Sequence, residues 1–291
     1  MFYQVLGPTF KEKLEEQASG TTVPIVNKSK FNSIPIVLPC IEEQRRIVTL
    51  LDEAFADIAI AKANAEKNLQ NARELFESQR QLLLQPKDDW HEATLADLCN
   101  IKHGYAFEGE YFSDAGDHVL LTPGSFFETG GFRDRGEKTK YFTGLIPSNY
   151  VLNQGDLLVA MTEQAAGLLG SPLLVPESNR FLHNQRLGLV TGKPNIPWTN
   201  TFFFHVFNLE AVRKAIHASA SGAKVRHTSP GKVGAVKVVF PNNQAEQLRI
   251  AAQVKEIEQA SIALQSIYRQ KLTALDDLKK SLLHQAFRGQ L

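Results

Sequence analysis

The sequence of 291 residues contains only two cysteines, Cys40 and Cys99, which is too few for a disulfide framework and lacks the spacing of a zinc site. It has no run of about 18 apolar residues, so a transmembrane helix is excluded. The first residues have neither the basic start nor the apolar segment of a secretory signal. Neither charge dominates, because 32 Lys and Arg balance 31 Asp and Glu. These absences predict a cytoplasmic protein without membrane contact.

Catalytic motifs are missing as well. The sequence has no G-x-x-x-x-G-K-[ST] loop, no glycine-rich dinucleotide or S-adenosylmethionine loop, no H-E-x-x-H zinc motif and no G-x-S-x-G elbow. Its eight histidines are scattered along the chain, and Asp156 is expected to stabilise a turn before an apolar strand. We therefore expect a protein that is not an enzyme and that binds no cofactor and no metal.

The sequence does contain a long internal repeat. Residues 18–39 align without a gap with residues 220–241 at a constant shift of 202, and residues 2–5 resemble residues 203–206. A period of this length is typical of a duplicated unit made of a domain and a helix. The first copy lacks its front, since a complete copy predicts about 110 further residues before Phe2.

Two long helices are predicted to follow the similar passages IEEQRRI and QAEQLRI, which end at Ile47 and Ile250. In both, apolar and small residues recur at alternating steps of four and three, the heptad pattern of a coiled-coil seam. The predicted seam residues are Ile47, Leu51, Ala54, Ile58, Ala61, Ala65, Asn68, Ala72, Leu75, Gln79 and Leu82 in the first helix, and Ile250, Val254, Ile257, Ser261, Leu264, Tyr268, Leu275, Leu278 and Leu282 in the second. Because the helices have similar lengths, we expect them to pack against each other in antiparallel orientation.

The region between the helices has short apolar runs separated by Gly, Pro, Asn and Asp, which predicts strands of a mixed or antiparallel sheet with many loops. Residues 200–222 predict a strand that leads into a helix ending at Gly222. The expected fold class is α+β or α/β, a loop-rich mixed-sheet domain plus two long antiparallel coiled-coil helices. The expected divisions are the end of a first domain at 1–40, a first spacer helix at 41–86, a complete domain at 87–241 and a second spacer helix at 242–291.

Charge is unevenly distributed in the middle region. Residues 91–131 contain one lysine against seven acidic residues, a net charge of −6, whereas residues 132–240 contain 13 Lys or Arg against six acidic residues, a net charge of +7. Such asymmetry can direct phosphate groups to one face of a protein. A solvated surface unrelated to function is the alternative.

Taken together, these passages resemble the specificity subunits of type I restriction-modification systems. The resemblance rests on both helix starts, on IKHGYAFEGEYF and QGDLLVAMTEQAAGLLG in the middle domain, and on the closing SLLHQAFRGQL. It implies that 87–241 is a target recognition domain that reads half of a bipartite site in double-stranded DNA, and that 1–40 is the remnant of another. It also implies methyltransferase subunits docked on the helices and motor-nuclease subunits in the full complex.

Side chains in turns of the net-positive stretch are the candidates for DNA contact, because Asn and Gln amides can bond adenine while Arg suits guanine or phosphate. The candidates form four clusters: Asn184, Gln185 and Arg186; Lys224, Arg226 and His227; Thr162 and Gln164; and Arg133, Arg135, Lys138 and Lys140. For each cluster the alternative is a solvated loop. At the helix starts, Arg46 and Arg249 are expected to contact a methyltransferase subunit.

Other functions remain open. A DNA methyltransferase or nuclease is disfavoured by the missing cofactor loop and the missing N-P-P-[FY] tetrapeptide. A coiled-coil scaffold or regulator would bind methyltransferase subunits through the helices without reading DNA. With one complete recognition domain, the chain is expected either to form a homodimer that reads an interrupted palindrome or to remain a monomer that reads one half-site.

Overall fold

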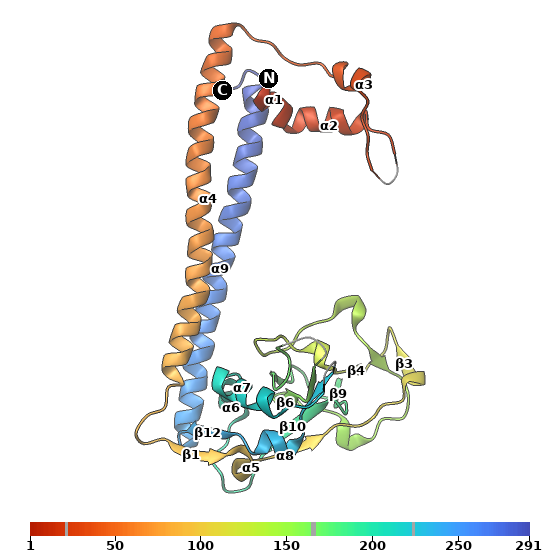
Figure 1. Ribbon diagram of the computed structural model, residues 1–291, viewed down its shortest axis with the longest axis vertical. Helices are drawn as coiled ribbons and strands as arrows, with labels where there is room; N and C mark the ends of the chain where they lie inside the picture. The colour runs from red at the N-terminus through yellow and green to blue at the C-terminus, as the bar shows by residue number, and fades with distance from the viewer. Residues whose placement is uncertain (21–22, 164–166, 223–224) are drawn as a thin grey trace. The chain divides into compact units, whose positions relative to one another are not determined.

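The structure is a computed structural model that describes residues 1–20, 23–163, 167–222 and 225–291. The chain divides into two compact units (Figure 1). The first unit consists of Met1–Ser78 and Ile257–Leu291, and the second unit consists of Gln79–Glu256.

The two long helices begin at the repeated passages. Helix α4 covers Ile41–Leu83 and helix α9 covers Gln244–Ala286, with 43 residues in each. In the first unit they run antiparallel (Figure 1), because the Ser261 hydroxyl donates to the Ala72 carbonyl at 3.0 Å while Ile47 and Leu283 share a cluster of buried residues. The prediction of two long antiparallel helices is confirmed.

The seam between the helices follows the predicted heptads only in part. The buried residues of α4 recur at steps of four and seven, and they are Ile47, Leu51, Ile58, Ala65 and Ala72. Five predicted seam residues are instead exposed, namely Leu75, Gln79, Leu82, Leu264 and Leu278. The prediction was wrong for these five because two helices bury only the side chains along their line of contact, which is narrower than the predicted stripe.

Short helices α1 (Phe2–Leu6), α2 (Pro8–Glu16) and α3 (Lys28–Asn32) precede α4. Pro8 occupies the first turn of α2, where its missing N–H costs nothing, and the Asn27 side chain caps α3. The Tyr3 ring packs edge-on against Phe55 at a centroid distance of 5.4 Å, and its hydroxyl donates to Asp52. These contacts attach the first residues of the chain to α4.

The second unit repeats these short elements before its own long helix. Helices α6 (Asn200–Phe207), α7 (Glu210–Ser219) and α8 (Pro230–Gly234) precede α9 as α1, α2 and α3 precede α4. The bounds of α3 and α8 differ by the shift of 202 found in the sequence. Gly20 and Gly222 stand at the same shift, and both adopt a positive φ, of 111° and 106°, that favours glycine. The internal repeat is therefore structural.

Residues 200–207 form helix α6, so the predicted strand at this position was wrong. The run of phenylalanines has high strand propensity. The spacing of the buried residues is nevertheless that of one helix face, as shown by Phe202, Phe203, Val206 and Phe207. Packing of this face outweighed the strand propensity of the phenylalanines. The helix predicted to end at Gly222 is α7, which ends at Ser219.

Strands of the second unit form small sheets. In the described part of the chain, one four-stranded antiparallel sheet has the order β2 (Cys99–His103), β10 (Leu187–Gly192), β6 (Leu157–Ala160) and β8 (Pro172–Leu174). Another has the order β3 (Phe112–Ser113), β5 (Tyr141–Phe142), β4 (Val119–Leu120) and β9 (Phe181–Leu182), with β4 and β9 parallel. The predicted mixed-sheet fold class is confirmed.

A two-stranded sheet contains the strand that precedes α9 in the sequence. Strand β12 (Lys237–Phe240) pairs antiparallel with β1 (His91–Thr94), and Thr94 then caps helix α5 (Leu95–Leu98) in a reciprocal pair with Asp97. A second short pair joins β7 (Thr162–Glu163) to β11 (Arg226–His227). Between strands the chain makes single 3₁₀ turns, at Gly109–Tyr111, Pro123–Ser125, Gly136–Lys138 and Ser148–Tyr150.

The core of the second unit fills the space between these sheets. Its fully buried members include Leu121, Phe126, Leu158, Leu173 and Leu187. None of the helices among the described residues has both the length and the apolar character that crossing a bilayer requires.

Candidate nucleic-acid interface

The fold brings three of the four predicted DNA-contact clusters together on the second unit. The backbone N–H of Met161 donates to the carbonyl of Arg186 at 3.0 Å, and the N–H of Thr228 donates to the carbonyl of Met161 at 3.0 Å. In the β7–β11 pair, Thr162 stands opposite His227. Segments that are far apart in the sequence therefore lie side by side as one surface, which we call the joined surface. Its exposed or partly exposed predicted residues are Thr162, Gln185, Arg186, Arg226 and His227.

The turn that carries Gln185 and Arg186 is fixed by buried neighbours. Asn184 is 8% exposed, and its Oδ1 accepts the N–H of Arg186 at 2.9 Å. The carbonyl of Asn184 accepts the N–H of Leu187 at 3.0 Å. The Asn184 side chain thus shapes the turn, while Gln185 and Arg186 are left exposed on the surface.

His183 stands fully buried at the base of the same turn. Burial lowers its pKa to about 4, so the imidazole is neutral at neutral pH. Its Nε2 lies 3.0 Å from the Leu187 carbonyl, which requires the proton on that nitrogen. Within the described residues its Nδ1 has no hydrogen-bond partner. A neutral histidine in this place supports the turn and supplies no charge to the surface.

The segment HGY at 103–105 borders the turn and was not among the predicted contacts. The N–H of Tyr105 donates to the His183 carbonyl at 2.8 Å, and its carbonyl accepts the N–H of Gln185 at 2.9 Å. Gly104 permits this approach, because a β-carbon there would lie 2.1 Å from the Asn184 carbonyl oxygen. His103 and Tyr105 are both exposed beside Gln185. The glycine between two polar residues was the available sequence signal, but its partner segment is 80 residues away.

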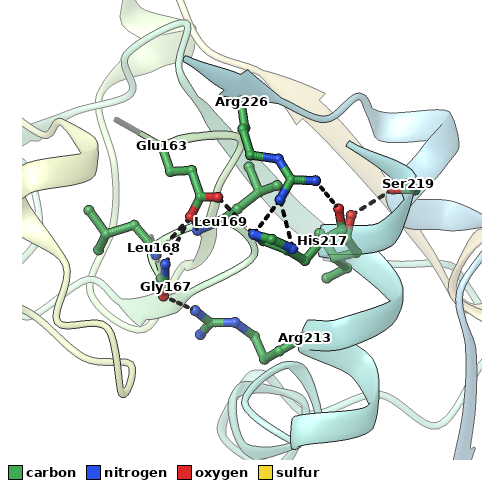
Figure 2. Close-up of polar contacts among 9 residues, drawn as sticks. Glu163, Gly167, Leu168, Leu169, Arg213, His217, Ser219 and Arg226 are labelled. Atoms are coloured by element: carbon green, nitrogen blue, oxygen red, sulfur yellow. Dashed lines mark hydrogen bonds and ion pairs between the residues drawn. The ribbon is translucent and has the colours of Figure 1, made fainter. Parts of the chain in front are cut away.

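A buried carboxylate organises the loop after β7 (Figure 2). Glu163 is 3% exposed, and its Oε2 accepts the backbone N–H groups of Gly167, Leu168 and Leu169 at 3.1, 3.1 and 3.0 Å. Its Oε1 lies 3.0 Å from Nε2 of His217, on helix α7. Burying an unpaired carboxylate would be costly, whereas this one is satisfied on both oxygens.

Two arginines complete this cluster (Figure 2). The Arg226 Nη2 donates to the His217 carbonyl at 2.7 Å, and its Nη1 also contacts the His217 ring. Arg213 donates to the Gly167 carbonyl, and burial lowers the pKa of its guanidinium. Arg226 is thus tethered inward from its place in the joined surface. Gln164 and Lys224, two other predicted contacts, lie outside the described residues.

The fourth predicted cluster lines a separate hollow of 550 Å³. Arg133, Arg135, Lys138 and Lys140 contribute to its wall together with Arg180. Arg180, in the wall of the hollow, directly precedes β9, and the turn that carries Gln185 and Arg186 of the joined surface follows β9 in the chain.

Part of the charge in the hollow is neutralised by neighbouring acids. Glu128 pairs with Arg133 at 2.5 Å, and Glu177 pairs with Arg180 at 3.0 Å. For Arg135 and Lys138 the described structure gives no ion pair. The hollow is therefore a cationic surface beside the joined surface.

The arginines at the two helix starts each pair with the glutamate three residues earlier. Arg46 makes two hydrogen bonds to Glu43, at 2.8 and 2.7 Å, and Arg249 makes two to Glu246, at 2.8 and 2.6 Å. The bond from Arg249, with help from Lys87, lowers the pKa of Glu246 to about 2. Both guanidinium groups remain about half exposed, so the pairing leaves them accessible to a partner.

The second unit thus combines a loop-rich mixed-sheet fold with exposed amide, imidazole and guanidinium groups. Among the described residues no group of His, Cys, Asp and Glu side chains is arranged to hold a metal ion.

Comparison with known proteins shows what the chain is similar to. Residues 2–71 match the family model described as "Type I restriction modification DNA specificity domain". The chain is 22% identical over 298 residues to the type I restriction enzyme MjaVIII specificity subunit of Methanocaldococcus jannaschii, covering 96% of this chain and 67% of that protein. It is 28% identical over 160 residues to the EcoBI specificity subunit of Escherichia coli, covering 54% of this chain and 30% of that protein.

Solved structures share the fold. One, from a study of complex assembly and conformational transition of the type I R-M system, matches with a TM-score of 0.78 at 17% identity, over all of this chain and 70% of its own. The HsdS subunit of Thermoanaerobacter tengcongensis matches with a TM-score of 0.63, also at 17% identity and with the same coverage. The chain is therefore similar in sequence to two specificity subunits of type I restriction-modification systems and similar in fold to the HsdS subunit.

Proposed function

We propose that this protein is the DNA-recognition subunit of a type I restriction-modification complex and that it performs no catalysis of its own. The observation that carries the proposal is the joined surface, where three clusters chosen for their base-compatible side chains meet through backbone hydrogen bonds. The names of the two curated relatives, both specificity subunits, support the non-catalytic role.

On this proposal, the joined surface reads bases and the neighbouring hollow holds phosphates. The Gln185 amide can donate to and accept from one adenine, and Arg186 can bond the O6 and N7 of guanine. Both extend from a turn whose backbone is fixed by Asn184, which limits the loss of freedom on binding. The cations of the hollow, among them Arg135 and Lys138, suit sequence-independent contacts with the DNA backbone.

The proposed domain roles follow the divisions expected from the sequence. Residues 87–241 act as the target recognition domain, and 41–86 and 242–291 act as spacer helices. Methyltransferase subunits dock at the helix starts beside Arg46 and Arg249, and motor-nuclease subunits join that complex. The likeness to a chain solved in a study of type I R-M complex assembly supports this arrangement.

A homodimer remains part of the proposal. Two copies related by a two-fold axis would present two identical recognition domains and would read an interrupted palindrome. Light scattering on the purified chain measures the mass directly. A scaffold that binds methyltransferase subunits without reading DNA is disfavoured, because it gives no role to the exposed side chains of the joined surface.

The DNA-reading role is tested by substituting Arg186. If Arg186 reads a base, Arg186→Ala costs about 1–3 kcal/mol of binding free energy on the preferred duplex and relaxes preference at one position. If it contacts phosphate, affinity falls alike on all duplexes and the salt slope decreases by about one. Lys237→Ala removes an exposed cation that pairs with Glu92 on the β1–β12 sheet and serves as the control. Unchanged affinity and salt slope in Arg186→Ala would exclude the turn from the interface.

A further inference from the structure

One arginine of the joined surface is anchored by a residue that the sequence did not single out. Arg226 stands opposite Glu163 in the β7–β11 pair, and its guanidinium contacts His217 in the last turn of helix α7 (Figure 2). Its Nη2 donates to the His217 carbonyl at 2.7 Å, and its Nη1 lies 2.9 Å from Nδ1 of the His217 ring. Both terminal nitrogens of Arg226 are therefore held by one residue.

The carboxylate of Glu163 decides which ring nitrogen of His217 carries the proton. Its Oε1 lies 3.0 Å from Nε2, and an ionised carboxylate only accepts, so the neutral ring has its proton on Nε2. The Arg226 Nη1 also lies 2.6 Å from Nε2, but in this tautomer only Nδ1 has a lone pair that can accept its N–H. His217 thus donates to Glu163 and accepts from Arg226.

Glu163 is itself fixed by the backbone. It is 3% exposed, and its Oε2 accepts the N–H groups of residues 167–169. These backbone groups orient the carboxylate, the carboxylate orients the His217 ring, and His217 orients the guanidinium of Arg226. A long side chain that is ordered in advance loses less conformational freedom when it binds a ligand.

Arg226 retains donors for such a ligand. Its guanidinium carries more N–H groups than the two that the described bonds to His217 use. The residue is partly exposed, and its neighbour His227 stands opposite Thr162 on the joined surface. Because the N–H groups of arginine lie in one plane, they suit the oxygens of a phosphate.

We infer that His217 is a positioning residue for DNA binding, whose neutral ring, held by Glu163, fixes Arg226 for contact with a DNA phosphate. This role rests on the proposed DNA-reading function and assigns to it a residue that acts through Arg226. A proton added to His217 would occupy Nδ1 and face the Nη1 N–H, so the ring would lose the lone pair that holds the guanidinium. The contribution of Arg226 to DNA affinity should therefore decrease as the pH falls.

The charges around His217 also oppose its protonation. Besides Glu163 on β7 and Arg226 on β11, Arg213 lies one turn earlier on the same face of α7. Two arginines and one carboxylate give this group a net charge of +1, which a proton on His217 would raise to +2. His227 follows Arg226 on β11 and therefore faces the other side of the strand pair. The other titratable side chains of α7 and of the helices packed against it, α6 and α8, have no described contact with the His217 ring, and they are Glu210, Lys214, His205 and Lys232.

The experiment measures the affinity of the full chain for a labelled duplex by fluorescence anisotropy. A duplex of arbitrary sequence serves, because a phosphate contact does not depend on sequence. At about pH 8, Arg226→Ala should weaken binding about tenfold and His217→Ala about fivefold. The double variant should bind no more weakly than Arg226→Ala, because His217 acts through Arg226. Lys214→Ala removes an exposed cation of the same helix, which pairs with Glu210, and should change the affinity by less than about twofold.

Two variants separate positioning from a purely structural role. Glu163→Gln keeps a carbonyl oxygen for residues 167–169 and turns its amide NH₂ toward Nε2, so the proton of His217 should move to Nδ1. Nitrogen NMR of the ring detects this change, and DNA affinity should fall as in His217→Ala. His217→Gln supplies one donor and one acceptor but cannot gain a proton, so it should restore affinity to within about twofold of the wild type.

The pH profile gives the decisive comparison. The ratio of wild-type affinity to that of Arg226→Ala should decrease about threefold or more between about pH 8 and pH 5.5, a range in which histidine gains charge. The ratio cancels the charge that the other histidines gain, and it should not vary with pH when both chains carry His217→Gln. A ratio that rises or stays constant overturns the inference.

The affinities at about pH 8 separate this inference from the DNA-reading role. Wild-type affinity in Arg226→Ala, or in His217→Ala while Arg226→Ala binds weakly, overturns the positioning role and leaves the DNA-reading role standing. A wild-type chain that binds no duplex at any pH refutes both. Circular dichroism of each variant shows that a loss of affinity does not result from unfolding.

Discussion

Replacing the buried glutamine of the repeat gives a stability prediction with an internal control. Gln247→Met keeps the length of the side chain but removes hydrogen bonds to Pro197, Thr199 and Pro241. A typical net contribution of about 1 kcal/mol per bond predicts a loss of about 3 kcal/mol in the free energy of unfolding. Gln44→Met removes the single described bond, to Pro39, and predicts a loss of at most about 1 kcal/mol.

Far-UV circular dichroism is the appropriate assay for both variants, because both units contain helices, and tryptophan fluorescence reports the second unit separately, since Trp90 and Trp198 belong to it. Urea unfolding of the wild type and both variants gives the two losses on the same scale. The difference of about 2 kcal/mol is a factor of roughly 30 in the unfolding equilibrium constant. A loss below 1 kcal/mol for Gln247→Met, or an equally large loss for Gln44→Met, would show that the hydrogen bonds to Pro197 and Thr199 do not stabilise the second unit.

Three further predictions concern other parts of the molecule. Burial lowers the pKa of His205 to about 4, so the stability contributed by its neutral form is complete above about pH 6.5 and is lost as the pH falls toward 4. His205→Gln introduces the residue found at the equivalent position, Gln4. The urea midpoint of this variant should vary less with pH than that of the wild type. Glu163→Ala leaves three backbone N–H groups without their acceptor and should cost about 3 kcal/mol or more, with faster hydrogen exchange at residues 167–169, whereas Glu163→Gln should cost less because it keeps one carbonyl oxygen. Charge reversal of Arg46 and Arg249 together should reduce co-purification of a methyltransferase subunit without unfolding the chain, and unchanged co-purification would remove the helix starts from that interface.

The long helices were predictable because their signal is local and repeated. The passages around Gln44 and Gln247 recur with their neighbours, and the structure explains the recurrence: each glutamine bonds the carbonyl of the proline before its helix. Helix α6 was mispredicted as a strand because the burial of Phe203 and its neighbours depends on residues far away in the sequence. Local propensity carries no information about the distant residues that bury this helix face.

The candidate site was predictable only as separate turns. Residue type identified Gln185, Arg186 and His227, but only the fold shows that the backbone around Met161 joins their segments. The inward roles of Asn184 and Arg226 also depend on tertiary partners, namely the next turn and helix α7. For the same reason, the local sequence around Tyr105 did not show that this segment borders the turn.

The DNA-reading role is tested most directly by co-expressing the chain with a type I methyltransferase subunit and mapping the methylated sites. Methylation is expected at one defined sequence, which is lost or relaxed at a single base position in Arg186→Ala, and at an interrupted palindrome if two copies associate. Methylation that does not depend on this chain, or an unchanged target sequence after substitution of both Gln185 and Arg186, would contradict the DNA-reading role.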